Sequence, residues 1–237
     1  MLAALCGQKD VFDLLVSNGA DLTLVDAKNE GVLYYACKGS NTSIVQHLIK
    51  VCDINQRLSD GLTPVMLAAL CGQKDVFDLL VSNAADLTLV DDDDNSVLHY
   101  ACQGGNTSIV QHLITACDIN KKGRDGRTPV MLAAVCGQKD VFDLLVSNAA
   151  DLTLVDAKNE GVLHYACQGG NTSIVQHLIR VCDINKKGRD GRTPVLVAAL
   201  CSQKDVFDLL VSNAADLTLV DDEDNSVLHY ACQGGKA

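Results

Sequence analysis

The sequence predicts an all-α solenoid of stacked helix–turn–helix units joined by β-turn loops. The first observation is an internal repeat: segment 125–134 recurs almost unchanged at 60–69 and 190–199, with a spacing of 65 residues. The second is that each 65-residue unit divides into two related halves, and each half holds two short apolar-periodic segments separated by a glycine. Because such units bury their apolar faces against neighbouring copies, we expect the chain to grow along one axis.

The first half of a unit, residues 60–92, predicts a helix pair with a clear start. Thr63 and Pro64 mark the first helix, because a threonine hydroxyl can cap free backbone N–H groups and proline suits the first helical position. Gly72 then permits the chain to reverse. The residues expected to form the buried stripe of the second helix are Val76, Leu79 and Leu80.

The second half, residues 93–124, predicts a similar helix pair that begins differently. Ser96 takes the capping position and no proline follows it, and two other copies have Gly31 and Gly161 at this place. This half is one residue shorter, so the chain alternates between steps of 33 and 32 residues.

These residues resemble the ankyrin repeat, whose pattern runs Asp-x-x-Gly-x-Thr-Pro-Leu-His-x-Ala-Ala, then Gly, then Val-x-x-Leu-Leu and Gly-Ala-Asp. The match recurs at the ankyrin length of about 33 residues and covers essentially the whole chain. The resemblance implies one ankyrin-repeat domain over residues 1–237. It would hold a partial repeat over 1–26, six full repeats over 28–222 and a partial repeat over 223–237.

One departure from the family pattern concerns the end of the second helix. Gly19 becomes Ala84, Ala149 and Ala214 at a position where helices often end in the left-handed conformation. Either the alanine adopts that conformation at a cost of about 1 kcal/mol, or Asn83 and its equivalents adopt it instead.

Charge and hydropathy argue against two classes of partner. The formal net charge is −11 and the pI is near 4.8, so we expect neither nucleic acid nor an anionic membrane to attract the chain. No apolar run approaches the roughly 20 residues that span a bilayer.

The eleven cysteines recur with the repeat and include no C-x-x-C pair. Their odd number and apolar neighbours predict free cysteines used as small core residues, in a reducing, cytoplasmic compartment.

The copies differ mainly in their loops, which the resemblance implies are fingers that form a protein-binding face together with the first helices. Basic loops are predicted to lie between acidic ones, an arrangement able to bind an elongated partner with spaced charges. The alternative is that these are solvated loop tips without a partner. The candidate residues are Lys121, Lys122, Arg124, Arg127, Lys186, Lys187, Arg189 and Arg192, and Asp92, Asp93, Asp94, Asp222, Glu223 and Asp224.

No catalytic, metal or cofactor site is predicted. The acidic run 91–95 lacks the alternating ligands, turn glycine and distal glutamate of a calcium loop. A nucleophilic pair of Cys102 and His99 would lie on a buried helix without room for a substrate. The resemblance implies that His99, His164 and His229 bond to neighbouring loops, and a surface or groove role is expected for His47, His112 and His177.

The leading functional hypothesis is a non-catalytic scaffold for protein–protein interaction. Two alternatives stay open, a structural or elastic spacer and an excised or engineered array without a specific ligand. Neither end carries a polar capping repeat, so end-to-end self-association is also expected.

Overall fold

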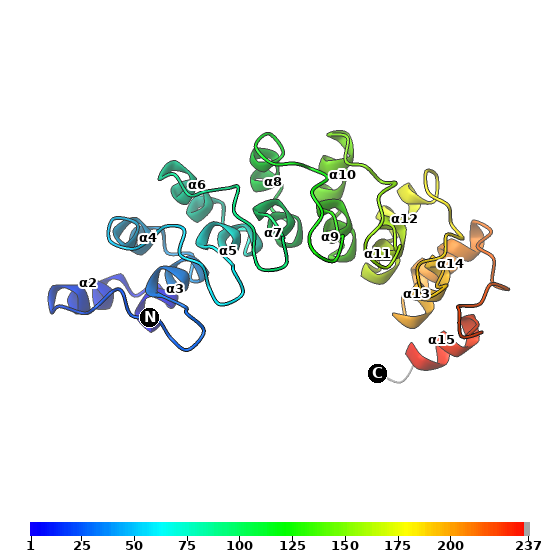
Figure 1. The fold of residues 1–237 in the computed structure, drawn as a ribbon, viewed down its shortest axis with the longest axis horizontal. Helices are drawn as coiled ribbons and strands as arrows, with labels where there is room; N and C mark the ends of the chain where they lie inside the picture. Colours follow the sequence, from blue (N-terminus) through cyan, green and yellow to red (C-terminus); the bar gives the residue numbers. More distant parts are fainter. Residues whose placement is uncertain (235–237) are drawn as a thin grey trace. The chain divides into compact units, whose positions relative to one another are not determined.

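A computed structural model describes residues 1–234 (Figure 1). The chain divides into two compact units, unit 1 (Met1–Asp118) and unit 2 (Ile119–Ala237), and each is described by itself. The helices of unit 1 are α1 (Leu2–Leu5), α2 (Lys9–Ser17), α3 (Val32–Lys38), α4 (Thr42–Leu48), α5 (Pro64–Leu70), α6 (Lys74–Ser82), α7 (Val97–Gly104) and α8 (Thr107–Leu113). Those of unit 2 are α9 (Pro129–Val135), α10 (Lys139–Ser147), α11 (Val162–Gly169), α12 (Thr172–Leu178), α13 (Pro194–Leu200), α14 (Lys204–Ser212) and α15 (Val227–Gly234).

Within each unit the helices form two layers. In unit 1 the first helices of successive repeats, α1, α3, α5 and α7, pack against one another in order, and so do the second helices α2, α4, α6 and α8 (Figure 1). In unit 2 the first helices are α9, α11, α13 and α15, and the second helices are α10, α12 and α14. Among residues 1–234 the β structure consists of isolated bridges and no sheet, so the predicted all-α solenoid of helix–turn–helix units is confirmed. The division of residues 1–237 into six full and two partial repeats of one domain stays a prediction.

The core lies between the two layers. Ala68 and Ala69 on α5 are fully buried, and their small side chains let neighbouring helices approach closely. On α6 the buried stripe consists of Val76, Phe77 and Leu80. The prediction was wrong about Leu79, which is half-buried, because Phe77 occupies the inward position.

The end of the second helix settles the choice left open by the sequence. Ala84, Ala149 and Ala214 have φ values of 64°, 63° and 63°, so these alanines adopt the left-handed conformation. Asn83 has φ −106° and does not take that role. At Gly72 the predicted reversal is confirmed, with φ +65°.

The starts of the first helices differ from the prediction. Pro64 does take the first helical position, but the Thr63 hydroxyl is buried and has no hydrogen-bond partner within residues 1–234, so the predicted side-chain cap is wrong. In the second half the backbone N–H of Ser96 donates instead to Nδ1 of His99 at 3.0 Å. The third helical position of α5 holds Met66, whose thioether is a weak acceptor compared with imidazole.

The cysteines pack less uniformly than predicted. All eleven are free, but only Cys37, Cys102 and Cys167 are buried. Burial raises the pKa of the Cys37 thiol to about 12. Cys71 and Cys136 are exposed because each follows the last residue of a first helix, so the prediction of core cysteines is wrong for that column.

Apolar side chains are exposed at both ends of the described chain. Leu2, Leu14 and Leu228 are 76%, 63% and 73% exposed. End-to-end self-association stays a prediction, and light scattering over a concentration series would test it. Over residues 1–234 no helix is both long enough and apolar enough to span a bilayer.

Candidate interaction surface

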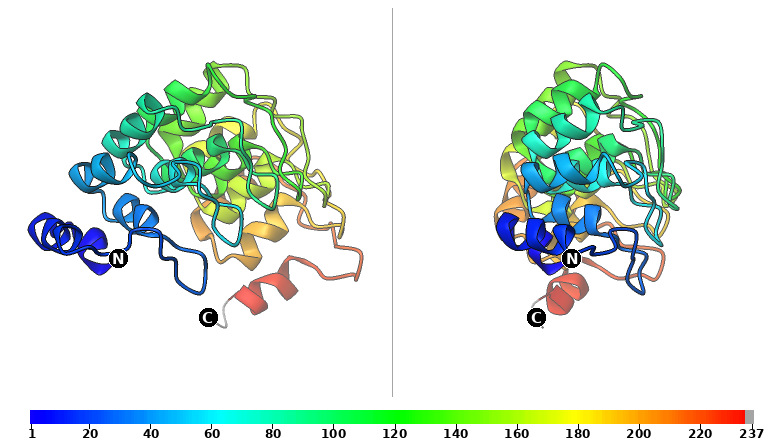
Figure 2. Two further views of the ribbon diagram at one scale, coloured as in Figure 1. Left: turned by 60° about the vertical axis from the view of Figure 1, so that its left-hand side comes forward. Right: turned by 90° about the vertical axis from the view of Figure 1, so that its left-hand side faces the viewer.

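The loops that follow the second helices extend as fingers, and within each unit they project to the same side of the helices (Figure 2). In finger 121–127 the Gly123 N–H donates to the Arg127 carbonyl at 3.0 Å, which closes a tight turn. Gly126 has φ +77°, and a Cβ there would lie 2.7 Å from the Ala157 nitrogen. The Asp-Gly sequence therefore supplies the one residue type that this turn and this close approach allow.

Successive fingers within a unit are joined by backbone hydrogen bonds. In unit 2 the N–H of Ala157 donates to Asp125 O at 2.8 Å, and the N–H of Arg189 donates to Lys158 O at 2.5 Å. In unit 1 the N–H of Asp92 donates to Asp60 O at 3.0 Å. These bonds make each set of fingers a continuous edge.

An aspartate organises each of the fingers that begin at residues 26, 91, 156 and 221, and it is buried at the last three of these positions. Asp156 Oδ1 accepts the backbone N–H groups of Lys158 and Glu160, both at 2.8 Å, and its Oδ2 accepts the Tyr165 hydroxyl at 2.6 Å. Burial and the bond to Asp156 raise the pKa of Tyr165. This pair was not predicted from the sequence, although an aspartate followed by a tyrosine nine residues later recurs at 26 and 35, 91 and 100, 156 and 165, and 221 and 230.

The equivalent network around Asp221 sets the protonation of that carboxylate. Burial by itself would raise the pKa of Asp221, but hydrogen bonds from Tyr230, Asn225 and Glu223 outweigh it and hold the pKa well below its usual range. Asp221 therefore stays ionised and anchors its finger.

Two of the predicted basic residues bind the tyrosines of the following repeat. Arg127 Nε donates to the Tyr165 hydroxyl at 3.1 Å, and its guanidinium carbon lies 5.6 Å from the ring centroid. Arg192 makes the same contacts with Tyr230, at 2.8 Å and 5.5 Å. These arginines are therefore held in place by the fold.

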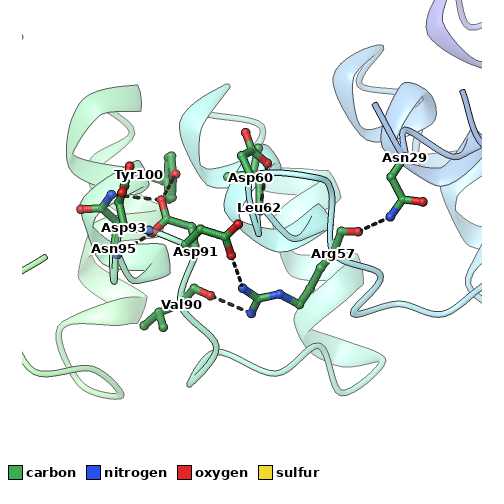
Figure 3. Close-up of polar contacts among 10 residues, drawn as sticks. Asn29, Arg57, Asp60, Leu62, Val90, Asp91, Asp93, Asn95 and Tyr100 are labelled. Carbon is green, nitrogen blue, oxygen red and sulfur yellow. Dashed lines mark hydrogen bonds and ion pairs between the residues drawn. The ribbon is translucent and has the colours of Figure 1, made fainter. Parts of the chain in front are cut away.

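Lysines at equivalent positions donate to backbone carbonyls of the next finger. Lys122 Nζ lies 2.6 Å from Val155 O, and Lys187 Nζ lies 2.7 Å from Val220 O. Arg57 occupies this position in unit 1, where it donates to Val90 O at 2.8 Å (Figure 3). It also forms an ion pair of 3.1 Å with Asp92.

The other predicted residues lie at the tips or on the finger stems. Lys121 is half-buried, and Lys186 lines a pocket beside α11. The exposed residues are Asp92, Asp93, Asp94, Arg124, Arg189, Asp222, Glu223 and Asp224. The structure thus joins Arg57 to Asp92 and joins fingers 156–160 and 186–192 to each other. Lys158, which was not among the predicted residues, is exposed at the tip between the two basic fingers.

The histidines have structural contacts. His164 Nε2 bridges the carbonyls of Lys186 and Arg192 at 3.0 and 3.2 Å, which confirms the expected bond to a neighbouring loop. His47 and His177 pack edge-on against Phe12 and Phe142, with ring centroids 5.5 and 5.7 Å apart. Within residues 1–234 no three His, Cys, Asp or Glu side chains are placed to hold a metal ion.

Stacked helix pairs with a bonded row of fingers define a helical repeat protein. A family model described as ankyrin repeats (3 copies) matches residues 1–91, 83–156 and 157–237. The chain belongs to the ankyrin-repeat family, a general protein–protein interaction module that is generally non-catalytic.

Curated proteins show the same likeness. Protein glp-1 of Caenorhabditis elegans is 30% identical over 206 residues, which cover 80% of this chain and 16% of that protein. Neurogenic locus notch homolog protein 2 of Homo sapiens is 29% identical over 187 residues, which cover 77% of this chain and 7% of that protein. Neurogenic locus notch homolog protein 1 of Homo sapiens is 29% identical over 182 residues, which cover 76% and 6%. The chain thus spans only a small part of these relatives.

Proposed function

We propose that this chain is a non-catalytic scaffold that binds a protein partner through its fingers and the adjacent first helices. The observation that carries the proposal is the bonded row of fingers, in which cations such as Lys122 and Lys187 are held in fixed positions. Side chains held in this way lose little conformational entropy when a partner binds. The loop differences between copies then set which partner is bound.

A capture experiment from cell lysate tests this proposal. The wild-type chain is compared with a finger variant that carries Glu at Lys121, Lys122, Lys186 and Lys187. The matched control carries Glu at four lysines of the second helices, Lys9, Lys74, Lys139 and Lys204, so that both variants change the net charge equally. We expect some proteins to be captured by the wild type and by the control but not by the finger variant. Circular dichroism should show that all three forms are folded. Recovery of the same proteins by all three would refute binding through the fingers.

We also propose a reducing, cytoplasmic location. The absence of disulfides among the eleven cysteines supports it, since exposed thiols such as Cys71 and Cys136 stay free only where oxidation is held back. Microscopy of the tagged protein in its own cells, together with thiol labelling of a fresh lysate, tests the location.

A further inference from the structure

Two fingers of unit 2 concentrate positive charge on an otherwise acidic protein. Fingers 121–127 and 186–192 share the sequence Lys-Lys-Gly-Arg-Asp-Gly-Arg, with four cations and one carboxylate each. Residues 119–192 hold 11 Lys and Arg against 8 Asp and Glu, whereas the whole chain has a net charge of −11. The exposed side chain of Lys158 lies on the finger between them.

One lysine of each of these fingers is held in place by a backbone carbonyl, which carries no net charge. Lys122 and Lys187 donate to the carbonyls of Val155 and Val220, so the hydrogen bonds fix their positions without cancelling the charge. In unit 1 the equivalent Arg57 is paired with Asp92. Finger 156–160 has Ala157 at the place of that aspartate, so Lys122 has no carboxylate there to pair with. Beside Lys187 the place is taken by Asp222, so the charge is least compensated at the first of the two fingers.

The fold sets the separation of the two basic fingers. α9 packs on α11 and α11 on α13, and the fingers 121–127 and 186–192 lead into α9 and α13. Each helix-packing step is about 8–10 Å, so the two fingers lie about 16–20 Å apart. An extended chain rises about 3.3 Å per residue, and it therefore covers this separation in five or six residues.

A pocket lies beside the second basic finger. Its volume is about 210 Å³, and its lining includes Leu152, Gly161, Val162, Val181 and Lys186. Apolar cavities of about 150 Å³ accept a benzene ring, so this pocket has room for one leucine or phenylalanine side chain.

The difference between copies explains why this pocket is open. At the equivalent place in unit 1 a Cβ on Gly31 would lie 2.9 Å from the Gln56 amide oxygen, so that glutamine covers the glycine. A Cβ on Gly161 would meet nothing closer than Leu154 O at 3.8 Å. Lys186, which replaces the glutamine, leaves the space beside Gly161 open.

We propose that unit 2 binds an extended acidic segment of a partner protein, with carboxylates five or six residues apart on fingers 121–127 and 186–192 and one apolar side chain in the pocket beside Lys186. This inference rests on the proposed function and names the class of partner. The positive charge of the fingers selects the acidic groups, and the pocket fixes the register of the segment.

Fluorescence anisotropy of labelled 12-residue peptides binding to the full chain tests the inference. The probe carries two Glu-Glu pairs whose centres are six residues apart and a phenylalanine beside the second pair. We expect the double variant Lys122→Gln/Lys187→Gln to weaken binding about tenfold and the control Lys139→Gln/Lys204→Gln, with the same charge change on the second helices, to weaken it less than about twofold. Equal losses would mean nonspecific attraction and would overturn the inference.

Two further comparisons test the spacing and the pocket. A peptide whose glutamate pairs are only two residues apart should bind about fivefold more weakly, because it reaches one finger only. Lys186→Gln restores the glutamine that covers Gly31 at the equivalent place in unit 1. It should weaken the phenylalanine peptide several-fold more than its Phe→Ser counterpart, because the lost charge affects both peptides and the covered pocket affects only the first. The inference would be overturned if neither the shorter spacing nor the pocket substitution changed the affinity. It would also be overturned if a 12-nucleotide oligothymidine competed with the labelled peptide as strongly as the unlabelled peptide does. If lysate capture depends on the fingers while the peptide does not bind, the acidic class is wrong and the proposed function stands.

Discussion

We expect the protein to become more stable when the alanines in the left-handed conformation are replaced by glycine. In the variant Ala84→Gly/Ala149→Gly/Ala214→Gly, each substitution removes a methyl group at φ 63–64° on an exposed residue, so little burial is lost. The left-handed conformation costs a non-glycine residue about 1–2 kcal/mol, and the added freedom of glycine in the unfolded chain returns about 0.4–1 kcal/mol. The net gain is about 0.8 kcal/mol per site.

The three sites lie in different repeats, so their effects add to about 2 kcal/mol. For a chain of this size that is a rise in Tm of about 4–8 °C, which circular dichroism during heating and urea unfolding both measure. Gly19→Ala, at the equivalent position with φ +80°, should lower stability by the same amount per site. Ala85→Gly serves as the control at a buried alanine outside the left-handed region and should also be destabilising. A triple variant that is no more stable than the wild type would refute the strain argument.

Three more predictions follow from contacts within and between repeats. Tyr165→Phe removes the hydroxyl bonded to buried Asp156. Urea unfolding should show that the free energy of unfolding falls by about 2 kcal/mol, the usual contribution of a hydrogen bond to a charged group. A fall of less than about 0.5 kcal/mol would contradict this prediction. Met131→His gives α9 the side chain that makes the contacts of His164 on α11. We expect the free energy of unfolding to rise by about 1 kcal/mol, whereas the control Met131→Leu should leave it unchanged. A fall in the unfolding midpoint of Met131→His would contradict this prediction. The pKa of Asp221 is lower in the folded than in the unfolded chain, so its stabilisation is present above the unfolded pKa and is lost as pH falls through the folded one. Unfolding midpoints should therefore decline below about pH 4, and Asp221→Asn should make that decline shallower; an unchanged slope would count against the assignment.

Much of the local structure could be predicted from residue types. Pro64 begins a helix and Gly72 reverses the chain because each acts on its own backbone conformation. The predictions were wrong where contacts with other side chains determine which residue is buried or hydrogen-bonded. The Thr63 hydroxyl lacks a bond although its type favours capping, and Phe77 took the inward position expected for Leu79.

The candidate fingers were predictable as a set of loops, but not the state of each side chain. Lys122 and Lys187 differ from Lys121 and Lys186 only by one position, yet the first two donate to a neighbouring carbonyl and Lys186 lines a pocket. The aspartate–tyrosine pairs were visible as a recurring spacing, although nothing in that spacing shows that the hydroxyl and carboxylate meet.

The sequence alone therefore determined the repeat period, the helix pairs and the loops that vary, because these depend on local backbone preferences and on apolar periodicity. Only the tertiary structure decided that Ala84 adopts the left-handed conformation, that Arg127 rests on Tyr165, and that the space beside Gly161 is open. The last two features depend on residues 25–38 positions apart that meet when one repeat packs on the next, and the alanine conformation depends on how the second helix is tied to the following loop.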